Sequence, residues 1–210
     1  MFRVYSIGHS VYPYEFFLGQ LRKNEVDCVV DVRSTPFSRY ASQYNKEKIH
    51  EYLKLHGLMY LFMGEELGAR RSDLTLYNAD GYVDFEKVSR SDLFLVGIER
   101  IMAGLQKGYN VALMCTEKDP IECHRAILVS KGLQDCGCAV SHIKEDGNTE
   151  TQSQLEERML KHYFPNWGQQ SLFVDPENVY SRNDIVIKSY QLKNEDIGYR
   201  LDSEYKEAGG

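Results

Sequence analysis

The sequence lacks the features of a membrane or secreted protein. No apolar run approaches the roughly 20 residues that a membrane-spanning helix needs. The N-terminal residues MFRVYSIGHS do not contain the apolar core of a signal peptide. The five cysteines are an odd number and have no spacing typical of a disulfide framework. We therefore expect a cytoplasmic protein with free thiols and no membrane partner.

Positive charge is also scarce, and several common motifs are absent. The 25 basic and 31 acidic residues give a net charge of −6, which argues against broad non-specific nucleic-acid binding but leaves a local basic cleft open. The chain has no phosphate-binding P-loop, no G-x-G-x-x-G and no G-x-S-x-G. The C-x5-R loop of phosphatases is missing because Arg125 lies ten residues after Cys115.

What is present indicates a globular α/β protein, with 42% hydrophobic and 27% charged residues. Short apolar segments alternate with helical periodicity, which predicts a Rossmann-like, mainly parallel sheet of about five strands with helices on both faces. The expected strands are 3–7, 27–32, 58–62, 110–115 and 139–143. The expected helices are 13–24, 46–55, 85–107 in two parts, 123–136 and 154–163, with a long loop at 63–81.

A composition change near residue 146 divides the chain in this prediction. Residues 1–146 form the α/β domain, and residues 147–210 form a C-terminal helix and extension packed on it. The polar segment 164–210 has no assigned structure.

The segment 111–125 is the most informative part of the chain. It reads VALMCTEKDPIECHR, a buried strand that ends at Cys115, a polar turn, and a helix start that contains Cys123, His124 and Arg125. A helix N-terminus carries partial positive charge and unpaired N–H groups, which suit an anion and lower the pKa of a nearby thiol. The segment therefore predicts an anion or thiolate site.

Other polar side chains follow the predicted strands. His9, Asp31 with Arg33, and Glu66 stand at or just beyond the ends of three of them. Ligands of open α/β sheets bind outside the carboxyl ends of the strands, so we expect these groups and Cys115 to meet at one edge.

This edge predicts specific roles. Cys115 would act as nucleophile or as a polar positioning group, and His9 or His124 as general base. The predicted catalytic residues are Cys115, His9, His124, Asp31 and Glu66. The predicted ligand-binding or phosphate-binding residues are Gly8, Ser10, Arg33, Arg39, Gly64, Glu117 and Arg125. Each of these residues also has an ordinary structural interpretation, such as a helix cap, an ion pair or a solvated loop.

Zinc is the main chemical alternative. Cys115, Cys123, His124 and His9 include the ligand types of a tetrahedral site. The spacing C-x7-C-H matches no common zinc motif, and adjacent residues on a helix project about 100° apart. We therefore assign no metal ligand and no cofactor, and keep zinc as an alternative.

The chain also resembles a known family. Four motifs carry the resemblance: SIGHS at 6–10, VVDVRSTPFSRY at 29–40, YLFMGEELGAR at 60–70 and ALMCTEKDPIECHR at 112–125. They resemble the domain of unknown function 488 (DUF488) family over about residues 3 to 145, and YQLKNEDIGYR at 190–200 resembles its C-terminal segment. The resemblance implies an α/β domain with its motifs at strand ends and supplies no activity.

The motif positions transferred by this resemblance extend the predicted site. They are Gly8, His9, Ser10, Asp31, Arg33, Pro36, Arg39, Gly64, Glu66, Leu67, Gly68, Cys115, Glu117, Cys123, His124 and Arg125. One departure is visible, because Ala69 stands where the family commonly has a second glycine. Alanine lacks glycine's easy access to positive φ, which weakens the expectation of a tight backbone approach there.

Three functions remain open. The first is an enzyme that acts on a phosphorylated small molecule, a nucleotide or a nucleic-acid component. The second is a non-catalytic module that binds a nucleotide or nucleic acid, and the third is a zinc-stabilised interaction domain. The sequence specifies neither the substrate nor the oligomeric state.

Overall fold

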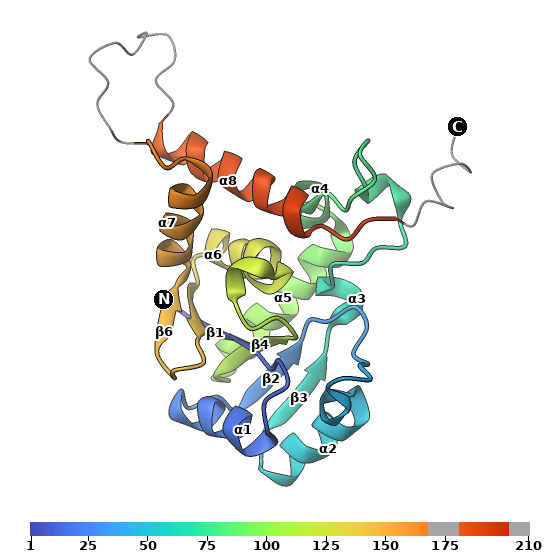
Figure 1. Cartoon of the computed structure of the whole chain (residues 1–210). Helices are drawn as coiled ribbons and strands as arrows, with labels where there is room; N and C mark the ends of the chain where they lie inside the picture. Colours follow the sequence, from blue (N-terminus) through green and yellow to red (C-terminus); the bar gives the residue numbers. More distant parts are fainter. Residues whose placement is uncertain (168–180, 202–210) are drawn as a thin grey trace, which may run out of the picture.

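The chain forms an α/β fold in which a six-stranded sheet lies between two layers of helices (Figure 1). This computed structural model describes residues 1–167 and 181–201. The strand order is β3-β2-β4-β1-β5-β6. Strands β1 to β5 are parallel, and β6 pairs antiparallel with β5. The predicted α/β class, with a mainly parallel sheet and helices on both faces, is confirmed.

All five predicted strands are present, with small shifts at their ends. The strands are β1 (Arg3–Gly8), β2 (Cys28–Asp31), β3 (Met59–Phe62), β4 (Val111–Cys115), β5 (Ala139–Ile143) and β6 (Thr149–Thr151). The sixth strand was not expected, because three residues are too few to show an alternating pattern. The predicted domain boundary at residue 146 lies in the turn between β5 and β6 and stays a prediction.

The observed helices agree with the predicted ones where the sequence has a clear helical periodicity of apolar residues. The α-helices are α1 (Tyr14–Lys23), α2 (Lys46–Leu55), α3 (Gly64–Leu67), α4 (Phe85–Ser89), α5 (Asp92–Gln106), α6 (Lys131–Asp135), α7 (Gln152–Tyr163) and α8 (Arg182–Ile197). Three 3-10 helices, η1 (Ser42–Tyr44), η2 (Leu74–Leu76) and η3 (Pro120–Glu122), and one π-helix, η4 (Arg125–Ser130), complete the elements. None of the helices in the two described ranges is long and apolar enough to span a membrane.

Two expectations about these segments were wrong, and a third segment had no assignment. The expected loop at 63–81 contains α3 and η2, and the expected single helix at 123–136 is η4 followed by α6. The C-terminal segment contains a second long helix, α8, which begins with a capping box between Ser181 and Asp184. The rest of the unassigned segment, residues 168–180 and 202–210, lies outside the described residues.

Two large apolar clusters form the core, one on each face of the sheet, and a small third one joins Leu160 of α7 to Ile185 and Val186 of α8. The helices α1 and α2 cover one face, where they pack on residues such as Val29, Ala112 and Met114. The helices α4 to α7 and η4 cover the other, where Leu113 and Cys115 belong to the cluster. Successive strand residues point to opposite faces, so β4 sends Cys115 and Met114 to different sides.

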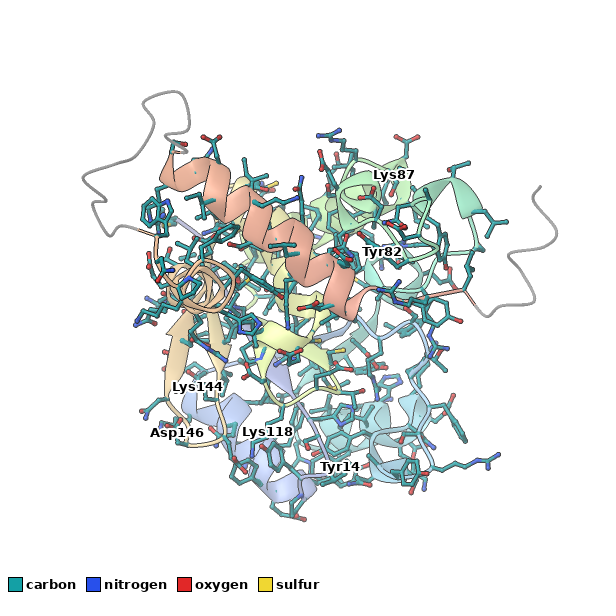
Figure 2. The ribbon with its side chains drawn as sticks, turned by 45° about the horizontal axis from the view of Figure 1, so that its top comes forward. Tyr14, Tyr82, Lys87, Lys118, Lys144 and Asp146 are labelled. Atoms are coloured by element: carbon teal, nitrogen blue, oxygen red, sulfur yellow. The ribbon has the colours of Figure 1, made fainter. Side chains whose placement is uncertain are left out.

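The turns after β4 and β5 lie beside each other at the carboxyl edge. Figure 2 shows Lys118, which follows β4, close to Lys144 and Asp146 of the β5–β6 turn. Lys118 forms an ion pair with Glu145 in that turn. The edge of the sheet is thus covered by polar turns.

Candidate functional site

The predicted strand-end residues share one edge of the sheet but lie on its two faces. In the parallel register Gly8 pairs with Cys115, and Asp31 pairs with Met114. Paired residues point to the same face and successive residues to opposite faces, so His9 and Asp31 project away from the side of Cys115. The single predicted cluster is therefore two clusters, back to back.

The first cluster joins two thiols, an imidazole and a carboxylate on the α5 side of the sheet. Nδ1 of His124 lies 3.9 Å from Sγ of Cys115 and 4.0 Å from Sγ of Cys123. Oε2 of Glu117 lies 3.1 Å from the sulfur of Cys115 and 2.9 Å from that of Cys123. The two sulfurs and the imidazole nitrogen all lie within 4.8 Å of one another. We call these four residues the thiol centre.

Two neighbours in the sequence can face the same point because the helix does not begin where expected. Cys123 has an extended backbone, with φ −141° and ψ 135°, and the π-helix begins only at Arg125. The predicted helix start at Cys123 is therefore wrong. Cys123 and His124 are therefore not separated by about 100° around a helix axis, and both join the thiol centre.

His124 is held in one tautomer by the end of β2. Its Nε2 lies 2.9 Å from the carbonyl oxygen of Val32. A carbonyl only accepts, so Nε2 carries a proton and Nδ1 faces the sulfurs. Burial opposes a charge on this ring, but the hydrogen bond with Cys123 and the charge of Cys123 raise the pKa of His124. In the neutral ring, the form that a metal would bind, Nδ1 carries the lone pair. In metal sites, a hydrogen bond of this kind from the other ring nitrogen to a carbonyl oxygen typically orients a histidine ligand.

Protonation of the two thiols differs from the expectation for Cys115. Burial and the hydrogen bond with Cys123 raise the pKa of Cys115. Burial also opposes ionisation of Cys123, but the hydrogen bond from Cys115 and the positive charge of Arg125 lower its pKa below the ordinary value. Cys123, and not Cys115, therefore holds the thiolate. The expected N-terminal α-helical turn is missing, so Cys115 faces the Cys123 thiolate and the Glu117 side chain instead.

Arg125 supplies a buried positive charge beside the thiol centre. Its side chain is completely buried and donates to the backbone oxygens of Glu117, at 2.7 Å, and Lys118, at 3.3 Å. Its Nε has no hydrogen-bond partner among the described residues. Within the same part of the chain no carboxylate is paired with Arg125. The Cys123 thiolate of the neighbouring thiol centre supplies negative charge that offsets this guanidinium.

The second cluster, on the α1–α2 side, is a closed ion-pair network. The guanidinium of Arg33 donates to Asp31 through Nε at 2.8 Å and through its NH2 group at 2.6 Å, and both residues are buried. The same NH2 group donates to the backbone oxygen of Tyr44 at 2.8 Å. Tyr60 donates to Asp31 at 2.7 Å. Arg33 thus makes most of its hydrogen bonds within the protein.

His9 completes this network in its neutral form. Its Nδ1 donates to the oxygen of Ser10 at 2.7 Å, and its Nε2 accepts from Arg33 at 3.0 Å. The ring stacks on Tyr44 with centroids 4.1 Å apart. Burial and the charge of Arg33 lower the pKa of His9 to about 4. The lone pair of Nε2 is already engaged, and a general-base role for His9 stays a prediction.

The remaining predicted residues lie around these clusters. Glu66 forms an ion pair with Arg100 of α5. Gly64 and Gly8 allow close contact with the backbones of Arg33 and Glu117, respectively. Ser10 adopts a positive φ of 46° and donates its N–H to Thr116 at 2.9 Å. Arg39 is exposed. The catalytic role predicted for Glu66 and the ligand-binding roles predicted for the others stay predictions.

A protein-family model matches the part of the chain that contains most of the residues at this edge. The family model described as "Domain of unknown function DUF488" matches residues 13–131, more than half of the chain. The chain belongs to the DUF488 family. The match contains the whole thiol centre, together with Asp31 and Arg33, but begins after His9 and ends before α7. Comparisons with curated proteins and with solved structures gave no match.

Residues that were not predicted as site residues also build this part of the DUF488 protein. Tyr44 and Tyr60 contact His9 and Asp31, and Arg158 and Lys193 form ion pairs with the turn between Cys115 and Cys123. No local pattern in the sequence marks these contacts. Of these four residues only Tyr60 lies in a predicted strand. The alternation of side chains along that strand places Tyr60 on the opposite face of the sheet from Met59 and Leu61, but it does not identify Asp31 as its hydrogen-bond partner.

Proposed function

We propose that this DUF488 protein binds a zinc ion at Cys115, Cys123 and His124, with Glu117 as the fourth ligand, and that the metal stabilises the carboxyl edge of the sheet. Zinc lies about 2.3 Å from sulfur and about 2.0 Å from nitrogen, so two tetrahedral ligands are about 3.5–3.8 Å apart. The sulfur-to-nitrogen distances of 3.9 and 4.0 Å come close to this spacing. This preformed arrangement is the observation on which the proposal rests.

The chemistry of the donors supports zinc over harder cations. Thiolate and imidazole ligands favour zinc, whereas magnesium and calcium prefer oxygen. Two thiolates and one carboxylate around a divalent ion leave one net negative charge. The buried guanidinium of Arg125, which donates to the backbone of Glu117, would balance it.

Burial supports a structural centre over a reactive one. Cys115 is 3% exposed, Cys123 1% and His124 9%. Structural zinc sites are closed by four protein ligands, whereas catalytic sites keep one position open. The same burial argues against Cys115 as a nucleophile for a large substrate. The hypotheses of an enzyme or a nucleotide-binding module for phosphorylated ligands receive less support from this geometry.

Metal content tests the proposal directly. The protein is stripped with a chelator, incubated with Zn²⁺, passed through a desalting column and measured by inductively coupled plasma mass spectrometry. We expect one zinc per chain, and its loss in Cys115→Ser and Cys123→Ser. Cys136→Ser is the matched control, because Cys136 is an exposed thiol outside the centre. A wild-type chain without zinc, or a Cys123→Ser chain with a full equivalent, would overturn the proposal.

Cobalt provides a second readout that identifies the ligands. Co²⁺ accepts the same tetrahedral ligand sets and absorbs visible and near-ultraviolet light when thiolates bind it. We expect thiolate-to-cobalt absorption in the wild type and a weaker band in each cysteine variant. A spectrum without thiolate bands would show that bound metal sits elsewhere.

A further inference from the structure

Two helices beyond the family-matched region hold the turn that carries the zinc ligands. Figure 1 shows α7 at one edge of the sheet and α8 running from beside α7 across the helices of that face, and Figure 2 shows the same two helices from another side. Side chains of both helices reach the segment 119–126, which contains Cys123 and His124. These contacts join parts of the chain that are 26 to 71 residues apart in the sequence.

The contact from α8 is an ion pair with a buried ammonium group. Nζ of Lys193 lies 2.6 Å from Oε1 of Glu122, the residue that directly precedes Cys123. The Lys193 side chain is only 6% exposed. Burial of an ammonium group is costly unless a carboxylate compensates it, so Lys193 restrains Glu122 more strongly than an exposed lysine would. Asp196, at 3.9 Å, is a more distant second partner.

The contact from α7 fixes the beginning of the same turn. The guanidinium of Arg158 donates to Oδ2 of Asp119 at 2.6 Å and to Oε2 of Glu150 at 2.7 Å. Oδ1 of Asp119 accepts the backbone N–H of Ile121 and so caps η3. Arg158 therefore joins the η3 cap to β6, and the turn is held at both ends.

We propose that Lys193 and Arg158 are positioning residues of the zinc centre. This inference rests on the proposed function. Ligands that are already in place lose little conformational freedom when metal binds, and a restrained turn slows the movement of Cys123 away from the ion. Residues that support metal ligands typically change metal affinity 10- to 100-fold when they are replaced. The helices α7 and α8 thus act as a clamp that keeps zinc in the domain.

The rate of zinc release tests the clamp. Zinc-loaded protein is mixed with an excess of a chromogenic chelator, and absorbance is followed with time. We expect release about 10-fold faster in Lys193→Met, Arg158→Met and Glu122→Gln than in the wild type. Lys193→Arg, which retains the positive charge, should restore much of the slow release. Arg182→Gln is the control, because Arg182 pairs with Glu157 between the same two helices and away from the turn.

The outcomes separate the clamp from general stability and from the zinc centre itself. Glu122→Gln is the decisive variant, because the Glu122 side chain is 56% exposed and the change preserves its shape. Unchanged thermal unfolding of the metal-free Glu122→Gln protein, together with faster release, supports the clamp. Zinc loading with wild-type release rates in all three variants would overturn the clamp and leave the centre standing. A wild type that takes up no zinc would overturn both.

Discussion

Gly8 lies directly against the backbone of Glu117. A Cβ atom on Gly8 would overlap the carbonyl oxygen of Glu117. The turn after β4 therefore passes over the end of β1 at a distance that only glycine allows. The same turn carries Glu117 to the two sulfurs of the thiol centre. The glycine of the SIGHS motif is thus explained by a protein contact.

Gly8→Ala should move this turn and weaken the centre. We expect a loss of about 1–3 kcal/mol in the free energy of unfolding, as for other overpacked sites, and weaker zinc binding. Gly104→Ala is the matched control, because nothing lies within 4 Å of its added Cβ in α5. The control should gain about 0.5–1 kcal/mol, since alanine favours a helix over glycine. Urea unfolding measures both, and equal effects would contradict the contact.

The ion pair between Asp31 and Arg33 should contribute to folding. Asp31→Asn leaves the buried guanidinium without its charge partner, and breaking such a pair typically costs about 3–5 kcal/mol. Glu86→Gln breaks the exposed pair with Arg90 and should cost less than about 0.5 kcal/mol. Chemical denaturation compares the two. If Asp31→Asn lowers the free energy of unfolding by less than about 1 kcal/mol, the buried charge of Arg33 does not depend on Asp31 for compensation.

Zinc should protect two cysteines from alkylation. In metal-free protein we expect exposed Cys136 to react first and Cys123 to react faster than Cys115, because only the thiolate is nucleophilic. Addition of zinc should slow Cys115 and Cys123 without affecting Cys136. Cys28, whose pKa is raised to about 11 by burial and by Asp27, should stay unmodified. Site-resolved mass spectrometry after iodoacetamide treatment measures each rate, and unprotected Cys123 would argue against its ligation.

Acid should destabilise the fold through two buried histidines. Burial, with the charges of Arg33 and Arg125 respectively, lowers the pKa of His9 to about 4 and that of His142 to about 3. Both values lie below the unfolded pKa of about 6.5, so the unfolded chain takes up protons first as the pH falls. The contribution of the two neutral histidines to the free energy of unfolding is complete above pH 6.5 and decreases as the pH falls toward 4. At pH 5 the loss, relative to neutral pH, is about 2 kcal/mol for each histidine.

Urea unfolding at pH 7.5 and pH 5 measures this loss. His142→Gln should reduce the difference between the two pH values, although the variant itself is less stable. His162→Gln, at an exposed position, should leave the difference unchanged. A wild type equally stable at both pH values would contradict the neutral, buried state of these rings.

Phosphate binding at the carboxyl edge stays a prediction. Of the three arginines predicted to bind phosphate, Arg39 is the one whose side chain is exposed. Arg33 and Arg125 are buried and bonded within the protein, whereas Arg39 is exposed between exposed Phe37 and Tyr40. If inorganic phosphate stabilises the protein in a thermal-shift titration, Arg39→Ala should weaken that stabilisation. A shift that survives in Arg39→Ala would place the anion elsewhere.

Local patterns were sufficient for most of the fold. The helix at 46–55 was predicted with its observed bounds, because Ile49 and Leu53 are spaced one turn apart and Gly57 follows with positive φ. The position of Cys115 at the end of β4 also followed from the apolar run before it, whereas its burial was not expected. The sequence also contained the ligand types of the thiol centre. Their geometry was predicted wrongly, because the helix was expected to begin at Cys123 and it begins at Arg125.

The sequence by itself determined the α/β class, the five parallel strands and the edge at which the motif residues gather, since periodicity and strand ends are local properties. Only the tertiary structure decided that His9 and Asp31 lie on one face of the sheet and Cys115 on the other, because β-sheet register fixes alternation between strands that are far apart in the sequence. It also decided which charges are compensated. In the sequence Arg33, Arg125 and Lys193 are simply three cations. In the structure Arg33 is buried beside the carboxylate of Asp31, Arg125 beside backbone oxygens, and Lys193 beside the turn that contains Glu122. These environments depend on the packing of elements that are far apart in the sequence.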